Sequence, residues 1–549
     1  MKLVIGKQTE SLVNSLNPFD HPGFFRQKII ANIKFTPRIH YNGRGFICAL
    51  ITSRCHVGCE DCMFFSNMSE GKNSYNTMSP QRISNLMKLV QDSNTGYLLV
   101  SGGGEGFLEP NLMYQIIKET KADVTWMVTS AFWARNRDTA EKVLKNMYDA
   151  FLRGNHKENK RKIVCRVSFD RFHMEALSIP GQNPLKYIIN IIKLFEERYS
   201  HEEGFVLMLH SLQGEEGLIT KLCDVVGGEK VVRALPSDGN VKVTESAIAV
   251  RLKSGYTFEI TYAKLLLSDL APDLRDEGEL KRKITVWEQD AFYNERGNPS
   301  VNYNMDGTIG TDMLVLYDGR VAGGWQAEMP DVLINIDTDN FTSIMKKTLS
   351  DPGVLGTIEN GLVYRFNIID EVCPKAVLRA KAVNVRDYTS PTLLEEDKVK
   401  LYYTIRVIQD FIARPGRVDI KDIAKWPAEL RSLVSLNKEE LQSLYRASEY
   451  DIVQQFVEQE GHFGAFAKLV KHYALKSDPQ IFQNFFKSHP DINNRTIDKW
   501  RLLLKRIINC WYDICFFNKI ELDAIEDVEY ILDKEILKGI RVYEGLTYR

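Results

Sequence analysis

The strongest constraint on the fold is an alternation of short apolar runs with longer amphipathic segments in the first half of the chain. Helical patterns are expected from Ser79-Pro80, after Pro110, and over residues 138–151 and 185–199. Ser79 suits the N-cap of a helix, and Pro80 suits its first position. Such repeated strand–helix units predict an α/β fold with a parallel sheet, which places ligands at the carboxyl ends of its strands. The apolar runs have strand length and lie at 46–52, 97–100, 124–128, 163–169 and 205–209.

Three clustered cysteines follow the first predicted strand. Cys55, Cys59 and Cys62 are separated by spacers of three and two residues. Thiolates bind the iron of iron–sulfur clusters, and three ligands for four irons leave one iron open. Zinc is an alternative, but a structural zinc site closes with four ligands, and His56 is poorly placed as the fourth. The spacing therefore favours a single [4Fe–4S] cluster over zinc or incidental cysteines.

The composition is typical of a cytoplasmic globular protein. The chain has 549 residues, which exceeds one ordinary domain, and 44% of them are hydrophobic, which supports packed cores. The net charge of -1 gives no reason to expect nucleic acid or an anionic membrane as partner. No secretory signal pattern and no apolar run of membrane-spanning length is present. Clustered thiols among nine cysteines indicate a metal site in a reducing compartment rather than a disulfide framework.

A glycine run, Ser101-Gly102-Gly103-Gly104-Glu105, ends the second predicted strand. Glycines let the backbone approach a ligand closely, and a carboxylate suits an ammonium group. The cysteine loop followed by this run at the next strand end resembles the signatures of the radical S-adenosylmethionine (SAM) superfamily. The resemblance covers roughly residues 44–235 and implies a partial (β/α) radical SAM barrel. It also implies that Gly102, Gly103, Gly104 and Glu105 hold the amino group of the methionine moiety of SAM.

The resemblance extends to two further strand ends. Thr129-Ser130, after the third predicted strand, stand where the family often has a serine, threonine or asparagine. Ser168 and Asp170, after the fourth, stand where a polar residue often contacts the ribose or carboxylate of SAM. Helix capping is the alternative role for Ser168 and Asp170.

Other positions leave alternatives open. The family usually has an aromatic residue just before the third cysteine; Asp61 stands there in this chain, and Phe64 or Phe65 could substitute beside the adenine. His173 could transfer a proton at the substrate or be a packed helix residue, and the same holds for His210.

The resemblance implies that the open iron binds SAM, which one electron cleaves to a 5′-deoxyadenosyl radical that abstracts hydrogen from a C–H bond. The implied substrate is a peptide or small natural product, and the implied partner is an electron donor such as flavodoxin or ferredoxin. Two alternatives are a non-catalytic iron–sulfur sensor or scaffold with the same fold, and a radical SAM enzyme that modifies a small metabolite or nucleoside. The intact run Gly102–Glu105 favours an enzyme, an oxidoreductase or transferase, because a sensor need not keep a site for the SAM amine.

The pattern changes after about residue 235, where hairpins are expected around residues 253–255 and 318–319. Residues 313–345 resemble the SPASM/twitch element that follows the barrel in some family members. Residues 323–326 (Gly-Gly-Trp-Gln) stand where those members have an auxiliary-cluster cysteine, so only one cluster is expected. Cys373 could donate hydrogen to a product, as in radical epimerases, or be a buried bystander thiol.

These patterns predict four regions. They are an N-terminal lead-in (1–43), the barrel (44–265), a SPASM/twitch-like region with β-hairpins and no cluster (266–390), and an all-helical C-terminal domain (391–549). In the last region, basic and aromatic residues around Lys499-Trp500-Arg501 have helical spacing, which favours a packed helix with a solvated basic edge over nucleic-acid binding.

Overall fold

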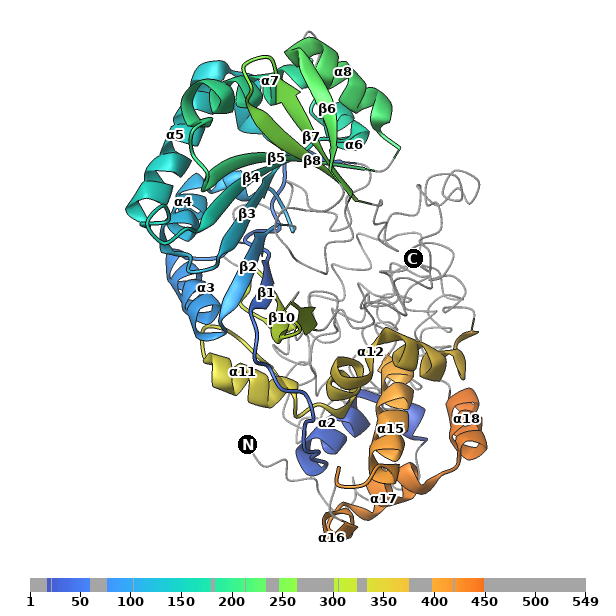
Figure 1. The fold of residues 1–549 in the computed structure, drawn as a ribbon. Helices are drawn as coiled ribbons and strands as arrows, with labels where there is room; N and C mark the ends of the chain where they lie inside the picture. The colour runs from blue at the N-terminus through green and yellow to red at the C-terminus, as the bar shows by residue number, and fades with distance from the viewer. Residues whose placement is uncertain are drawn as a thin grey trace, which may run out of the picture. The chain divides into compact units, whose positions relative to one another are not determined.

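The apolar runs after residue 44 become strands of one mixed sheet in a computed structural model of the chain (Figure 1). The structure describes residues 17–20, 22–59, 77–101, 103–178, 183–212, 214–233, 246–263, 301–304, 306–322, 333–374, 397–417 and 420–448. Within these residues the strands are β1 (Gly45–Ala49), β2 (Thr95–Val100), β3 (Val124–Thr129), β4 (Lys162–Ser168), β5 (Phe205–Leu212), β6 (Gly228–Arg233), β7 (Ser246–Leu252), β8 (Thr257–Ala263), β9 (Val301–Tyr303), β10 (Ile309–Val315) and β11 (Val321–Ala322).

The central strands run parallel in the order β10-β1-β2-β3-β4-β5-β8. The pairs β7–β8, β6–β7, β9–β10 and β10–β11 are antiparallel. The prediction of an α/β fold with a parallel sheet is therefore confirmed. The place of β10 beside β1, with Asp312 opposite Phe46, was not predicted. A Cβ at Gly310 would lie 1.8 Å from the carbonyl oxygen of Arg44, so only glycine permits this close approach.

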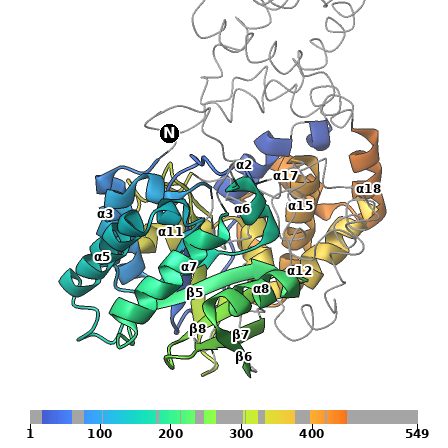
Figure 2. The same cartoon turned by 90° about the horizontal axis from the view of Figure 1, so that it is seen from above.

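Helices of the described part of the chain cover one face of the sheet (Figure 1 and Figure 2). Strand residues alternate between the two faces: Ile47 and Leu98 are buried among these helices, whereas Cys48 and Leu99 belong to a separate apolar cluster with Trp126. The covering helices are α3 (Pro80–Asp92), α4 (Pro110–Glu119), α5 (Arg137–Arg153), α7 (Leu185–Leu194), which continues as a π-helical turn over Phe195–Tyr199, and α8 (Glu216–Val226).

Local sequence signals are confirmed at the ends of several elements. Ser79 caps α3, where its side chain accepts a hydrogen bond from the N–H of Arg82 at 3.2 Å, and Pro80 is the first helical residue. The two expected hairpins are present as β7–β8 and β10–β11. They turn at Gly255 and Gly319, whose φ angles of 91° and 88° favour glycine. After β11 come α11 (Phe341–Thr348) and α12 (Pro352–Asp370).

Contacts divide the chain into an α/β unit, Thr36–Glu395, and a second unit, Met1–Phe35 with Glu396–Arg549, called the helical unit here because its described elements are helices. In the helical unit, Arg26 pairs with Asp397 at 2.6 Å, and Lys28 forms an ion pair with Glu429. This division differs from the expected one, because residues 17–35 pack with the described helices after residue 396 and β10 joins the sheet of β1 to β5. The described elements of the helical unit are a turn at Pro18–Asp20, α2 (Pro22–Asn32), α15 (Asp397–Ala413), α16 (Ile420–Ile423), α17 (Ala428–Ser435) and α18 (Lys438–Ala447).

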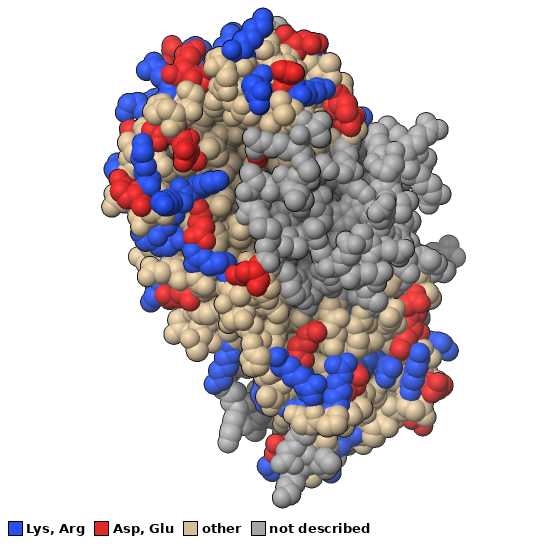
Figure 3. Space-filling model, in the orientation of Figure 1, with Lys and Arg blue, Asp and Glu red and all other residues tan. Residues whose placement is uncertain are grey.

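On the face drawn in Figure 3, basic and acidic side chains of the described residues are interspersed. Among the described helices, none combines the length and the apolar character that crossing a membrane requires.

Candidate iron–sulfur site

The cysteine loop follows β1 at the carboxyl end of the parallel sheet. Cys55 and Cys59 are partly exposed, whereas Cys48, Cys165 and Cys223 are buried. Cys62 lies outside the described residues, as do Asp61, Phe64 and Phe65. Within the described part of the chain, which thus contains two of the three loop cysteines, no group of three metal-ligating side chains gathers.

Opposing effects act on the thiol of Cys55. Burial raises the pKa of the Cys55 thiol, and the negative charge of Glu105 adds to the rise. The N–H groups of Val57 and Gly58 act in the opposite direction, and Val57 N–H donates to Cys55 Sγ at 3.5 Å. Cys59 is close enough for its charge to affect Cys55 as well. Two partly exposed sulfurs in one short loop, one of them with backbone donors, fit the ligand set of an iron–sulfur cluster.

The glycine turn after β2 packs directly on this loop. Gly103 has a φ of 75°, and a Cβ there would lie 2.6 Å from the carbonyl oxygen of Thr52. A Cβ at Gly104 would lie 2.1 Å from the carbonyl oxygen of Arg54, and the N–H of Glu105 donates to that same oxygen at 2.8 Å. These glycines are therefore needed to bring the backbone of the turn against the residues just before Cys55. Gly102 lies outside the described residues.

The structure brings Glu105, Thr129 and Ser130 together. Oε2 of Glu105 accepts hydrogen bonds from the backbone N–H and the hydroxyl of Ser130, at 2.7 and 2.6 Å. Oε1 accepts from the hydroxyl of Thr129 and from the N–H of Phe107, both at 3.0 Å. Glu105 is 4% exposed. The sequence grouped these residues as SAM-binding, but it gave no sign that they bond to one another.

Asp170 and His173 form a second polar group, at the end of β4. Asp170 caps α6 (Arg171–Ala176): one carboxylate oxygen accepts the backbone N–H of His173 at 2.9 Å, and the other bonds its ring Nδ1 at 2.8 Å. Burial acts to raise the pKa of Asp170, but the charge and hydrogen bonds of His173 lower it overall. Burial acts to lower the pKa of His173, but Asp170, and after it Cys59, raise it well above the usual value. The predicted capping role of Asp170 is thus observed, and His173 lies beside a loop cysteine.

A polar row crosses strands β4, β5 and β8 on the face opposite the helices. Nη2 of Arg166 donates to Nδ1 of His210 at 2.7 Å, and the hydroxyl of Thr261 lies 3.0 Å from the same nitrogen. Ser168 is opposite His210 in the register of β4 and β5. Arg166 and Thr261 were not predicted as site residues, although their alternation with buried apolar neighbours places them on this face.

Cys373 follows α12, and the hydrogen bond that the structure describes for it runs from its backbone N–H to the carbonyl of Ile369 in that helix. Its role as a hydrogen donor stays a prediction. Residues 323–326 lie outside the described residues.

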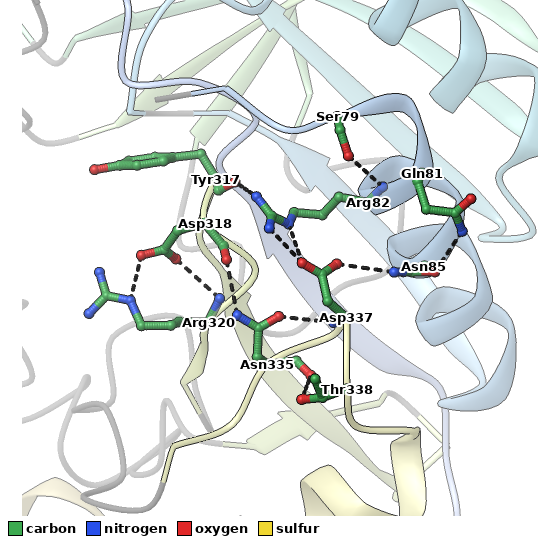
Figure 4. A network of polar contacts seen from close by, with 10 residues as sticks. All are labelled: Ser79, Gln81, Arg82, Asn85, Tyr317, Asp318, Arg320, Asn335, Asp337 and Thr338. Atoms are coloured by element: carbon green, nitrogen blue, oxygen red, sulfur yellow. Dashed lines mark hydrogen bonds and ion pairs between the residues drawn. The ribbon is translucent and has the colours of Figure 1, made fainter. Parts of the chain in front are cut away.

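Polar contacts tie the segment after β11 to α3, the helix that follows the cysteine loop (Figure 4). Arg82 Nε and Nη2 donate to Asp337 Oδ2 at 2.8 and 2.5 Å, and Arg82 Nη1 donates to the carbonyl of Tyr317 at 3.0 Å. Asn85 donates to the other oxygen of Asp337, and Asn335 donates to the carbonyl of Asp318, both at 3.0 Å. These contacts therefore hold Asp337, in the segment after β11, against α3 within the α/β unit.

Comparisons with known proteins give one family match in this part of the chain. Residues 41–171 match the family model of a 4Fe-4S single cluster domain. No curated protein matches the chain. Among solved structures, one described as native anSMEcpe with bound AdoMet matches 56% of this chain and 82% of its own, with 13% identity and a TM-score of 0.32. The region from the start of β1 to the first residue of α6, which contains the cysteine loop, is thus similar to domains that hold one [4Fe–4S] cluster.

Proposed function

We propose that the chain is a radical SAM enzyme with a partial (β/α) barrel and one [4Fe–4S] cluster on Cys55, Cys59 and Cys62. The observation that carries the proposal is the direct packing of the cysteine loop against the glycine turn. Loops that hold a cluster and a molecule bound to it must lie side by side, and the hydrogen bond from Glu105 N–H to the Arg54 carbonyl joins them. The match of residues 41–171 to a 4Fe-4S single cluster domain supports the same site.

When bound, the cluster and SAM would supply a 5′-deoxyadenosyl radical that removes hydrogen from an unactivated C–H bond. The three thiolates hold the cluster, and the glycine turn offers backbone groups to the methionine moiety of SAM. Ser168 and Asp170, both buried at the end of β4, are proposed to orient its ribose or carboxylate. The apolar core beneath the loop, with which Cys55 and Cys59 are in contact, limits access of water.

We propose a peptide or small natural product as substrate and a one-electron donor such as flavodoxin or ferredoxin as partner. The resemblance of residues 313–345 to the SPASM/twitch element supports this substrate class. The anchoring of Asp337 to Arg82 holds part of that segment near the helix that follows the cysteine loop.

The test is anaerobic reconstitution with iron and sulfide, reduction, addition of SAM, and measurement of 5′-deoxyadenosine by mass. The wild type is expected to bind four irons per chain and to form deoxyadenosine, and the Cys55/Cys59/Cys62→Ala variant is expected to do neither. Cys223→Ala, which removes a buried thiol from α8, is the matched control and should behave as the wild type.

Two results would contradict the proposal. If the reconstituted wild type held zinc, or no metal, the chain would not be an iron–sulfur protein. A wild type that holds four irons but does not bind SAM in equilibrium dialysis would favour an iron–sulfur sensor or scaffold.

A further inference from the structure

The resemblance makes the carboxylate of Glu105 a ligand of the SAM ammonium. The hydrogen bonds that this carboxylate already accepts from the chain argue against that role. An ionised carboxylate has about four lone-pair sites on its two oxygens. Four donors of the chain already occupy them: the N–H of Phe107, the hydroxyl of Thr129, and both the N–H and the hydroxyl of Ser130. All four distances lie between 2.6 and 3.0 Å, and the residue is 4% exposed.

The hydroxyl of Thr129, one of the partners of Glu105, also has all of its hydrogen-bonding sites in use. The hydroxyl of Thr129 donates its proton to Glu105 and accepts from the N–H of Ala131 and from Nε1 of Trp133, each at 3.1 Å. A hydroxyl has one proton and two acceptor sites, so these contacts use all of them. Thr129 is 2% exposed. Releasing either side chain to bind an ammonium would leave buried donors unsatisfied, at a cost of about 1–3 kcal/mol for each group.

The same contacts indicate a structural role for Glu105. Its side chain holds the end of β3, while its backbone N–H holds the carbonyl of Arg54, which directly precedes Cys55. We propose that Glu105 is a positioning residue, a latch that joins the end of β3 to the glycine turn and the cysteine loop, and that it does not bind the SAM ammonium. The statement about SAM rests on the proposed function, whereas the latch itself does not.

The latch is tested first without any cofactor, by a double-mutant cycle on the unfolding of the chain. Glu105→Gln, Ser130→Ala and the double variant are compared by thermal unfolding. A latch predicts that the double variant is about as unstable as the worse single variant, because both substitutions break one network. Additive losses would overturn the proposal. If Glu105→Gln does not fold, the cycle of Thr129→Val with Ser130→Ala probes the same carboxylate and is read in the same way.

Whether Glu105 binds the SAM ammonium is tested on the iron-loaded protein with two probes, SAM and an analogue of SAM that lacks the amino group. The ratio of their dissociation constants measures the contribution of the amino group. The proposal predicts the same ratio in the wild type and in Glu105→Gln, even if both constants rise. Glu141→Gln, which changes an exposed carboxylate, is the control and should alter neither constant.

The two possible failures are distinguishable. A ratio that falls to about one in Glu105→Gln alone would identify the carboxylate as the ammonium ligand and overturn this inference, while the proposed function would stand. If the iron-loaded wild type binds neither probe, the proposed function and the statement about SAM fail together, and the unfolding cycle still decides whether Glu105 is a latch.

Discussion

A side chain at position 104 has no room, because its Cβ would lie 2.1 Å from the carbonyl oxygen of Arg54. We expect Gly104→Ala to push the turn away from the cysteine loop, to cost about 1–3 kcal/mol in the free energy of unfolding, and to reduce iron uptake. The measurement is iron per chain after reconstitution, together with the unfolding temperature.

Gly217→Ala is the matched control for this substitution. Apart from its chain neighbours and the backbone of its own helix, nothing described lies within 4 Å of a Cβ at Gly217, in the first turn of α8. Alanine there should leave iron uptake unchanged and stabilise the chain by about 0.5–1 kcal/mol. Normal iron uptake by Gly104→Ala would show that the close approach is not needed for the cluster site.

At the scale of single residues, the sequence indicates which residues belong to the site better than it indicates which of them bond to one another. The cysteine spacing and the glycine run are local patterns, so Cys55, Cys59 and Gly104 could be singled out directly. The bonds from Ser130 to Glu105 and from Arg166 to His210 join residues 25 and 44 positions apart. No local pattern encodes such pairs, because they depend on which strand ends lie side by side.

Among the elements, α3 and the segment after β11 are joined through Asp337 (Figure 4). Burial acts to raise the pKa of Asp337, but the hydrogen bonds from Arg82 and Asn85 and the charge of Arg82 lower it overall, from 3.8. A lowered pKa in the folded state means that the stabilisation is present above the unfolded value and is lost as the pH falls through the folded one.

We therefore expect Asp337→Asn to lower the stability of the α/β unit by about 1 kcal/mol at neutral pH, a modest value because the side chain is 33% exposed. The difference from the wild type should shrink as the pH falls below 3.8 toward the lower pKa of the folded state. Calorimetry of both proteins from pH 7 to pH 3 measures this difference in stability. A difference that does not change with pH would mean that the ionised carboxylate is not what ties the segment to α3.

Many strands and helices were predictable one by one, and so was a parallel sheet, but the place of β10 in that sheet was not. The runs at residues 124–128 and 163–169 became β3 and β4 nearly as expected, because buried strands are short, apolar and β-branched. Other described elements were missed, among them β6, α6, α2 and α8. β6 and α6 are short and have polar residues on them. The parallel pairing of β10 with β1 depends on a contact between distant segments, which periodicity does not report.

At the scale of the whole molecule, Arg26 tests the division into two units. Its side chain is 2% exposed, and it donates to the side chain and the carbonyl of Asp397 at 2.6 and 2.7 Å. We expect Arg26→Met to destabilise the helical unit by about 2 kcal/mol, less than for a fully buried pair because the side chain of Asp397 is 27% exposed. Hydrogen exchange should become faster in α2 and α15.

The amides of β2 to β5 are the internal reference for this measurement. They belong to the α/β unit and should exchange at the wild-type rate. Faster exchange in the sheet as well would mean that the two units unfold together rather than separately.

The position of β10 also has a consequence for synthesis on the ribosome. β1 lies between β2 and β10, and β10 begins about 260 residues after β1 ends. At common rates of translation, roughly 10–50 s separate the emergence of these two strands. Throughout that interval the strand that leads into the cysteine loop has an open edge, which is prone to wrong pairing. Iron that reached the nascent chain in this interval would meet a sheet without β10, so we expect cluster insertion to follow the synthesis of β10.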